Sequence, residues 1–221
     1  MSEQKLINSF GRRVGKRLSQ SSKRILKDVL PQHAVNFQEL INSSRNLYLE
    51  IGSGNGDFII EFATNNPDIL CIGCEPYLNG IANTLKMINE HSIDNIKLWT
   101  DDVKLLLNQL PDNIFNMVYI LFPDPWPKQK QHKRRLINNE FLEFLYRKVT
   151  SEATLNIATD HQEYAEWILS HLLNQPNYRW QANAQSDWLL PFDYVTLTRY
   201  YKKAAYKALQ PYFFRFKIIK N

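Results

Sequence analysis

Residues 122–128, which read FPDPWPK, place an aspartate and a tryptophan among three prolines. Because proline fixes the backbone angle φ, such a loop should be stiff and should hold both side chains in place. The Trp126 ring can stack on a planar base, and the Asp124 carboxylate can accept hydrogen bonds from amino and imino groups. We interpret the loop as a surface that presents a planar heterocycle. A proline loop with Trp126 capped in the core is the alternative.

Basic residues continue this loop, in the run KQKQHKRR at residues 128–135. Positive charges beside a base-binding loop suit the phosphates of a nucleic acid backbone. We therefore predict that Lys128 contacts a phosphate or the base, and that RNA is contacted by Lys133, Arg134 and Arg135. A solvated basic helix start is the alternative interpretation.

A glycine-rich turn, GSGNG at residues 52–56, follows an apolar strand-like run. Glycine lets the backbone approach a ligand closely, because no Cβ intervenes. Glu75 ends the next strand-like run, where an acid can accept hydrogen bonds from both ribose hydroxyls of an adenosine. Asp102 follows the third run and is placed to meet the adenine amino group. The predicted cofactor-binding residues are Glu50, Gly52, Gly54, Gly56, Glu75 and Asp102.

Two kinds of cofactor compete for this turn. Its spacing is G-x-G-x-G, whereas a dinucleotide site has G-x-G-x-x-G. Glu50 and Asp57 flank the turn; their charges would repel a pyrophosphate but suit the cationic sulfonium and ammonium groups of S-adenosylmethionine. The pattern favours S-adenosylmethionine over a nicotinamide or flavin, with a tight turn and solvated acids as the remaining alternative.

A parallel sheet would bring these residues to one edge. Apolar strand-like runs alternate with helical stretches from residue 47 onward, which predicts an α/β fold with a mostly parallel sheet covered on both faces. The expected strands are 47–51, 70–74, 95–99, 115–121 and 153–158. The expected helices are 57–65, 78–91, 102–109, 138–149 and 161–173, with short helices at 21–30 and 36–43 separated by Pro31. Residues 178–182 and 212–219 are an expected antiparallel edge pair.

Charge is divided unevenly along the 221 residues. Residues 1–30 carry a net +6 and residues 199–221 a net +7, which leaves −8 between them because the total is +5. Two basic ends on an acidic body favour a polyanionic partner over simple surface solvation. We expect residues 1–20 to be a mobile basic arm before a single domain at 21–221. The arm residues predicted to contact RNA are Arg12, Arg13, Lys16 and Arg17.

Some function classes are disfavoured by the sequence. No apolar stretch approaches the roughly 20 residues that cross a bilayer, and no secretory signal is visible, so a cytoplasmic protein without a membrane partner is expected. Cys71 and Cys74 would point to opposite faces of a strand, which predicts two core thiols rather than a metal or redox site. Monomer and homodimer both remain open.

The run FPDPWPKQKQHKRRL at residues 122–136 resembles the hallmark segment of bacterial tRNA (guanine-N7)-methyltransferases, the TrmB family, and the resemblance extends over most of the chain. Residues 9–13, with Gly15 and Lys16, are similar to the family's basic N-terminal segment. Glu50, Glu75 and Asp102 match its cofactor acids. The resemblance implies a Rossmann-like class I fold that uses S-adenosylmethionine, and methyl transfer to N7 of the variable-loop guanine in tRNA.

The same resemblance implies which residues contact the guanine that is methylated. Asp124 is the predicted catalytic residue, and the predicted substrate-binding residues are Lys128, Asp160, Thr198 and Tyr201. Capping of the following helix is an alternative role for Asp160. The family usually has a glutamate where Tyr201 stands, which puts one substrate contact in question. A degenerate RNA-binding protein without turnover, and a methyltransferase acting on another base or on a small molecule, are the rival functions.

Overall fold

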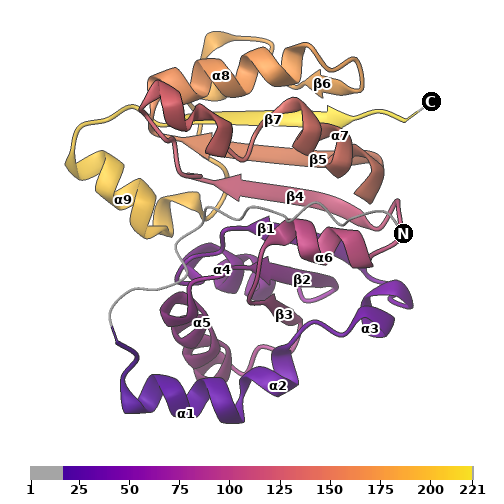
Figure 1. Cartoon of the computed structure of the whole chain (residues 1–221), viewed down its shortest axis with the longest axis vertical. Coiled ribbons are helices and arrows are strands. Elements are labelled where there is room, and N and C mark those ends of the chain that lie inside the picture. Colours follow the sequence, from indigo (N-terminus) through magenta and orange to yellow (C-terminus); the bar gives the residue numbers. More distant parts are fainter. Residues whose placement is uncertain (1–16, 221) are drawn as a thin grey trace.

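One sheet organises the chain, and the computed structural model describes its residues 17–220 (Figure 1). The strand order is β3-β2-β1-β4-β5-β7-β6. Among these strands β7 alone runs opposite to the other six, which confirms the predicted α/β, mostly parallel sheet. The strands are β1 (Asn46–Ile51), β2 (Ile69–Cys74), β3 (Ile96–Trp99), β4 (Phe115–Leu121), β5 (Val149–Thr159), β6 (Tyr178–Trp180) and β7 (Tyr212–Ile218).

The helices follow the strands in the order that the sequence predicts, with two additional helices. The α-helices are α1 (Gln20–Asp28), α2 (Leu30–His33), α3 (Phe37–Ile41), α4 (Asp57–Asn65), α5 (Leu78–His91), α6 (Val103–Gln109), α7 (Asn139–Lys148), α8 (Gln162–Leu173) and α9 (Arg199–Tyr206). Short 3-10 helices are η1 (Gln129–Arg134), η2 (Gln185–Trp188) and η3 (Val195–Leu197). The additional helices are α2 and α9, neither of which the sequence predicted. Pro31, expected between two helices, instead lies in the first turn of α2.

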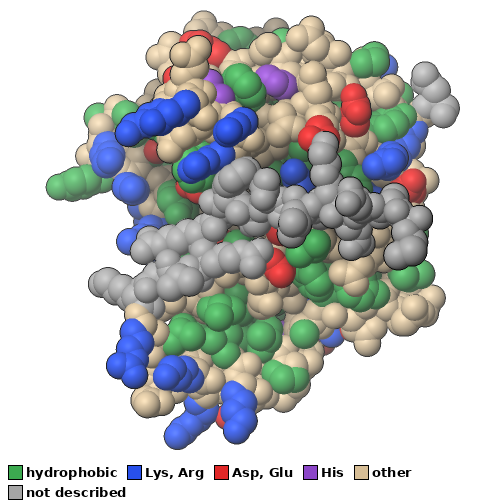
Figure 2. All heavy atoms as spheres, viewed as in Figure 1, with side chains coloured by type: hydrophobic (Ala, Val, Ile, Leu, Met, Phe, Trp, Pro, Cys, Tyr) green, Lys and Arg blue, Asp and Glu red, His purple; other side chains and the backbone are tan. Residues whose placement is uncertain are grey.

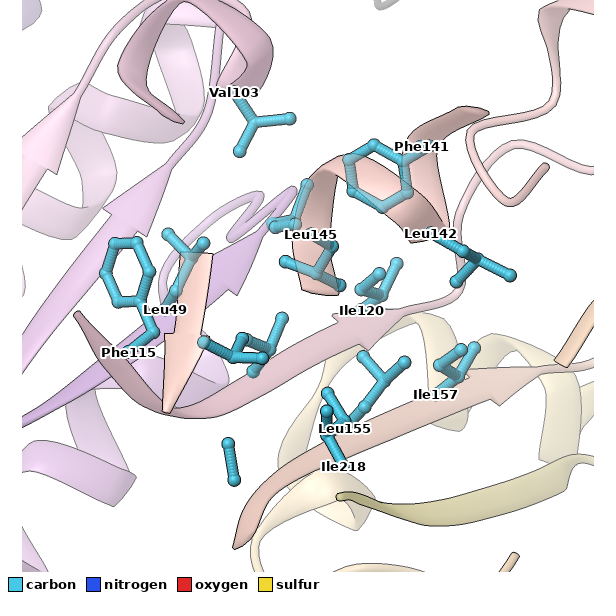
Figure 3. Close-up of a cluster of buried hydrophobic side chains, with 14 of the residues drawn as sticks. Leu49, Val103, Phe115, Ile120, Phe141, Leu142, Leu145, Leu155, Ile157 and Ile218 are labelled. Atoms are coloured by element: carbon cyan, nitrogen blue, oxygen red, sulfur yellow. The ribbon is translucent and has the colours of Figure 1, made fainter. Parts of the chain in front are cut away.

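Buried apolar side chains cover both faces of the sheet. In β1, Leu47 and Leu49 face one cluster while Tyr48 faces the other, as the alternation of a strand requires. Helices α6, α7 and α8 pack on the first face, and Figure 3 shows Val103, Phe141 and their neighbours over the strands. Helices α4 and α5 pack on the second face. Burial of apolar surface on both faces is the main force that holds the sheet and helices together.

The strand register brings four strand ends to one edge. Ile51 of β1 pairs with both Cys74 of β2 and Ile120 of β4. Leu121 of β4 pairs with Ala158 of β5. The glycine turn, Glu75, the proline loop and Asp160 all follow these positions, so they lie along the carboxyl edge, where α/β proteins bind their ligands.

The structure bears on the predictions for the two cysteines, the last two strands and the N-terminal basic residues. Cys71 and Cys74 are buried free thiols in opposite core clusters, as predicted. The antiparallel pair at the end of the chain is also confirmed, although β7 lies between β5 and β6 and β6 forms the edge. No helix in residues 17–220 is long and apolar enough to span a membrane. Arg12, Arg13 and Lys16 lie outside the described residues, and Arg17 is exposed.

Candidate functional site

The turn at residues 52–56 is a tightly packed, left-handed bend. Gly52, Gly54 and Gly56 have φ values of 82°, 56° and 87°. The Gly52 amide donates to the Cys74 carbonyl at 2.8 Å, which fastens the turn to the end of β2. Gly80 of α5 packs against it so closely that a Cβ there would lie 2.1 Å from the Gly54 carbonyl oxygen. Helix α5 therefore fixes the back of the turn, and the missing side chains keep its backbone accessible.

Glu75 is joined to this turn through its carboxylate. Its Oε2 accepts from the Gly54 amide and its Oε1 accepts from the Tyr77 amide, each at 2.8 Å. Burial raises the pKa of Glu75 in spite of these bonds, and the nearby charge of Asp124 raises it further. Each oxygen retains a second lone pair. A carboxylate held in this way fits the pair of ribose hydroxyls of an adenosine.

Glu50 is an acidic group buried at the end of β1, with 2% of its surface exposed. The Tyr48 hydroxyl donates to Glu50 Oε2 at 3.2 Å. Burial raises the pKa of Glu50 to about 8, and the charges of Glu75 and Asp57 act in the same direction. Negative charge concentrated in this way around the turn is unfavourable for phosphate and favourable for a cation. The residues therefore fit a cationic sulfonium ligand.

Asp102 lies at the same edge, after β3, and caps helix α6. Its Oδ1 accepts from the Lys104 amide at 2.8 Å, and its carbonyl accepts from Trp99 Nε1 at 3.0 Å. One carboxylate oxygen is therefore committed to the helix start. The adenine contact expected of Asp102 stays a prediction.

The proline loop after β4 contains two strained residues. Phe122 has φ 51° and Trp126 has φ 43°, values that residues with a Cβ rarely adopt. The Phe122 amide donates to the Ala158 carbonyl at 2.7 Å, which continues the pairing of β4 with β5. Between the strained positions, Asp124 is exposed, yet partial loss of water raises its pKa. Strain of this kind commonly accompanies a side chain that must be held in a functional orientation.

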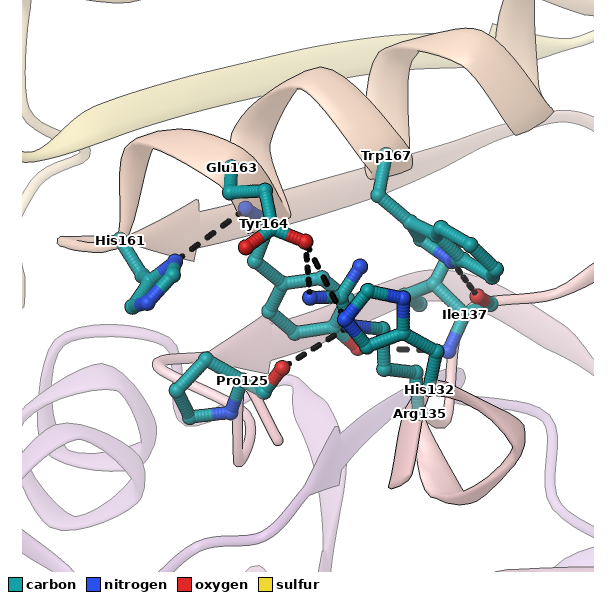
Figure 4. Close-up of polar contacts among 8 residues, drawn as sticks. All are labelled: Pro125, His132, Arg135, Ile137, His161, Glu163, Tyr164 and Trp167. Carbon is teal, nitrogen blue, oxygen red and sulfur yellow. Dashed lines mark hydrogen bonds and ion pairs between the residues drawn. The ribbon is translucent and has the colours of Figure 1, made fainter. Parts of the chain in front are cut away.

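Arg135 holds this loop from behind, and this corrects the expected RNA contact. Its side chain is 1% exposed, so it is not available to a nucleic acid. Its Nε donates to the Pro125 carbonyl and its Nη2 to Glu163 Oε1, both at 2.9 Å (Figure 4). The guanidinium also lies 4.8 Å from the centre of the Trp167 ring. The role that this geometry assigns to Arg135 is to position the loop.

The other basic side chains near the loop are better exposed to solvent. Lys128 and Lys133 are exposed. Arg134 places its guanidinium 4.9 Å from the centre of the half-buried Trp126 ring. Trp126 is therefore not capped inside the core, because a cation rather than the core covers its ring. Contacts of these cations with RNA stay predictions.

The three remaining substrate candidates differ in how they are used. Helix α8 is capped by His161, whose Nδ1 accepts from the Tyr164 amide at 3.3 Å, so Asp160 is not the cap. Thr198 is buried and caps α9: its hydroxyl donates to the Val195 carbonyl at 2.7 Å and accepts from the Tyr201 amide at 3.2 Å. Tyr201 is half-buried, with its ring 6.3 Å from that of Phe213. The substrate roles of all three stay predictions.

No metal centre is visible in the part of the chain that the structure describes. Residues 17–220 contain no group of three or more His, Cys, Asp or Glu side chains that could hold a metal ion. What the edge does hold is an acidic, glycine-lined bend next to a stiff loop that carries one exposed carboxylate.

Similarity to known proteins agrees with this site. Residues 44–212 match the family model described as "Putative methyltransferase". The 16S rRNA methyltransferase KamB has the same fold, with a TM-score of 0.61 at 15% identity over 95% of this chain and 99% of that one. An antibiotic-related methyltransferase gives a TM-score of 0.58 at 19% identity over 87% and 99% of the two chains. Fold and site together define a methyltransferase that uses S-adenosylmethionine on a Rossmann-like sheet.

The relatives of this chain define the family more narrowly. A tRNA (guanine-N(7)-)-methyltransferase of Wolbachia pipientis is 41% identical over 98% of this chain and 95% of its own length. Its counterpart from Hyphomonas neptunium is 37% identical over 89% and 93%. A bifunctional methyltransferase of Rickettsia conorii is 40% identical over 90% of this chain, which spans only 38% of that longer protein. The chain belongs to the tRNA (guanine-N7)-methyltransferase family.

Proposed function

We propose that this protein transfers a methyl group from S-adenosylmethionine to N7 of a guanine in tRNA, and that the guanine is the one in the variable loop. The observation that carries the proposal is the placement of Asp124. Its exposed carboxylate stands on a strained, clamped loop and lies near enough to Glu75 to raise the pKa of that group. A base-binding carboxylate and a ribose-binding carboxylate are therefore neighbours at one edge.

The residues around the turn would hold the donor. Glu75 is suited to the ribose hydroxyls, and the bend at residues 52–56 to the amino acid part of the molecule. Asp57, and Glu50 once the cationic ligand has driven off its proton, provide the negative potential that a sulfonium and an ammonium group require. When bound, S-adenosylmethionine supplies an electrophilic methyl group on a positively charged sulfur.

Guanine N7 already carries an in-plane lone pair and no proton. No side chain therefore has to remove a proton before the attack, so the reaction needs no histidine or other general base. The chain's contribution is alignment of the base, which can supply several kcal/mol, up to roughly 10 kcal/mol. Asp124 adds an electrostatic contribution, because a carboxylate beside the purine interacts more strongly with its developing positive charge than with the neutral base.

Other groups would hold the RNA around the reacting base. Lys128 and Lys133 are exposed beside the loop, and Arg134 covers the Trp126 ring. Asp160 directly follows β5, the strand next to β4, and His161 caps α8 in its place, which leaves Asp160 suited to the base edge. We include Arg12, Arg13, Lys16 and Arg17 as phosphate contacts, on the strength of their charge alone.

One experiment tests the proposal directly. The protein is incubated with an unmodified tRNA transcript and methyl-labelled S-adenosylmethionine, and the modified nucleotide is mapped. We expect one 7-methylguanosine, located in the variable loop. Label on another base or at another guanine contradicts the assignment. Tight binding of RNA and donor without any label would favour the rival function of an RNA-binding protein.

A further inference from the structure

Helix α9 carries its charge on one side only. At about 100° per residue, Arg199, Lys202, Lys203, Tyr206 and Lys207 fall on one face of a helix, and Ala204 falls opposite them. Ala204 is buried, whereas every residue of the first group is exposed. No acidic residue occurs anywhere in residues 199–221. Solvent therefore meets four cations, three on α9 and one at its C-cap Lys207, without an acidic residue on the same segment.

An aromatic ring stands among these cations. Tyr206 is 92% exposed, which is far more than the packing of this fold requires of a tyrosine. Lys203 and Lys207 lie three residues before it and one residue after it. Surfaces that bind single-stranded nucleic acid combine cations, which neutralise phosphates, with aromatic rings, which stack on bases. This face of α9 has both.

The start of α9 is fixed to both halves of the candidate site. The Arg199 amide donates at 3.1 Å to Asp57 Oδ2, in the first turn of α4 after the glycine bend. The ring of Tyr200 stacks on Phe122 with 6.2 Å between centroids and 20° between planes. Phe122 precedes Asp124 by two residues. The charged face is therefore continuous with the site rather than remote from it.

The views of the whole molecule agree with this placement. Figure 1 shows α9 on the side to which the arrowhead of β4 points, which is the carboxyl edge of the sheet. Figure 2 shows Lys and Arg side chains gathered along that side, over the region of α9 and over α1 below it. A strand of RNA whose base enters the site has to pass along this edge.

We propose that the outward face of α9 and its C-cap, formed by Arg199, Lys202, Lys203, Tyr206 and Lys207, is a docking surface for the tRNA strand next to the reacting guanine. The proposal rests on the proposed function, because it needs an RNA substrate. Lysine and arginine contact phosphates there, and Tyr206 stacks on an unpaired base. The surface acts on RNA affinity and not on the chemical step, since the contact that joins α9 to the loop of Asp124 is made by Tyr200 on Phe122 and not by a residue of this surface.

Two variants and one control test the surface. Lys202→Gln/Lys203→Gln removes two charges and keeps good helix formers, and Tyr206→Ala removes the ring. Lys86→Gln/Lys217→Gln removes two charges from ion pairs with Glu90 and Glu152 on other elements. For each protein we would measure the affinity for an unmodified tRNA transcript from 50 to 300 mM salt, about the range where phosphate contacts dominate. The rate of methyl transfer at saturating RNA and the affinity for S-adenosylmethionine are measured alongside.

For Lys202→Gln/Lys203→Gln we expect weaker RNA binding and a plot of log affinity against log salt that is flatter by about 1.4 to 1.8. For Tyr206→Ala we expect about tenfold weaker binding with an unchanged salt slope, because stacking is not ionic. Donor affinity and saturated turnover should equal those of the wild type. The control should leave RNA affinity and slope within experimental error of the wild type.

The outcomes separate this surface from the proposed function. If the wild type methylates tRNA but both variants keep the wild-type RNA affinity and salt slope, the docking surface is wrong and the proposed function stands. If RNA binding depends on Lys202 and Lys203 but the wild type transfers no methyl group, the docking surface stands and the proposed function is wrong. No RNA binding by the wild type overturns both proposals. Lysine-dependent binding to anionic lipid vesicles with RNA binding unaffected overturns the surface alone.

Discussion

The guanidinium of Arg135 donates to the carbonyl of Pro125 at 2.9 Å from a fully buried position. Pro125 directly follows Asp124, so the contact fixes the backbone beside the one exposed carboxylate of the loop. Glu163 and Trp167 hold the guanidinium in turn. The loop is therefore rigid for two reasons: its prolines restrict φ, and a buried cation binds its backbone.

Replacing Arg135 should displace the loop. Arg135→Met keeps an unbranched apolar side chain but leaves the Pro125 carbonyl without its charged donor. We expect a loss of about 1–3 kcal/mol in the free energy of unfolding, and a fall in turnover of roughly 10- to 100-fold, since misplacement by about 1 Å can have that effect. Donor affinity should change little. Chemical denaturation, calorimetric titration and saturated turnover measure the three quantities.

Glu163→Gln is the matched control for this prediction. The amide oxygen of glutamine can still accept from Arg135, so the loop should stay in place and turnover should remain within about twofold of the wild type. If Arg135→Met also turned over at the wild-type rate, the positioning role of Arg135 would be wrong.

Asp124→Ala should nearly abolish methyl transfer while leaving donor binding intact. Removing one electrostatic group that acts in the transition state typically lowers turnover by about 10²- to 10³-fold. Residual turnover within about tenfold of the wild type would contradict the role of Asp124. Single-turnover rates and donor titration provide the comparison.

The pH profile offers an independent check on Asp124. Its pKa is raised, so the carboxylate takes up a proton at a higher pH than an ordinary aspartate does. As the pH is lowered, wild-type turnover should therefore begin to fall at a higher pH than the pKa of an ordinary aspartate would predict. Asp124→Asn carries no ionisable group there, and its low residual rate should lack this acid limb.

Donor binding should release a proton from Glu50. With a pKa of about 8, this carboxyl group is mostly protonated at pH 7 in the free protein. A cationic ligand favours the ionised form and lowers the pKa, so affinity for S-adenosylmethionine should rise from pH 6 to about 8 and then level off. Calorimetry in buffers of different ionisation enthalpy counts the proton. In Glu50→Gln the rise should disappear; a wild-type affinity that is independent of pH would refute the link.

Gly80→Ala should destabilise the fold, although alanine normally stabilises a helix relative to glycine. The new Cβ would lie 2.1 Å from the Gly54 carbonyl oxygen, so the glycine bend must move. Overpacking of this kind costs about 1–3 kcal/mol, and the donor should bind more weakly. Thermal unfolding and donor titration are the measurements, with the exposed Lys86→Ala in the same helix as the control. An increased melting temperature for Gly80→Ala would show that the bend tolerates the methyl group.

Neutralising the N-terminal cations should weaken RNA binding more than catalysis. Replacement of Arg12, Arg13 and Lys16 by glutamine should flatten the salt dependence of RNA affinity by about 0.7 to 0.9 for each phosphate that is no longer neutralised. Turnover at saturating RNA should stay near that of the wild type. An unchanged salt slope would count against a role for these residues.

The sequence could locate the glycine bend and the acids beside it in the fold because those signals are local. A strand, its glycine turn and the acid that ends the next strand are read directly from alternation and spacing, and the sheet register then brings them together. Helix α9 was missed because a short run of lysines and tyrosines shows little apolar periodicity. The signal that reveals it is Thr198, a good N-cap residue before residues that form helices.

The burial of Arg135 could not be predicted from the residues around it in the sequence. Lys133 and Arg135 belong to one basic run, yet the first is exposed and the second is fully buried. The difference arises from Glu163, Tyr164 and Trp167, which lie about 30 residues further along the chain and reach Arg135 only after α8 has packed. The burial of a single charge thus depends on tertiary contacts that spacing alone does not reveal.

The position of β7 has a consequence for how the molecule assembles during synthesis. In the described sheet, β6 pairs with β7 and with no other strand, although β6 precedes β7 by more than thirty residues. A growing chain therefore emerges from the ribosome with β6 unpaired and with one side of β5 open, and both stay so until β7 arrives. Open strand sides invite pairing with other polypeptides. Translation that stalls between residues 181 and 211 should leave a nascent product that depends on chaperones.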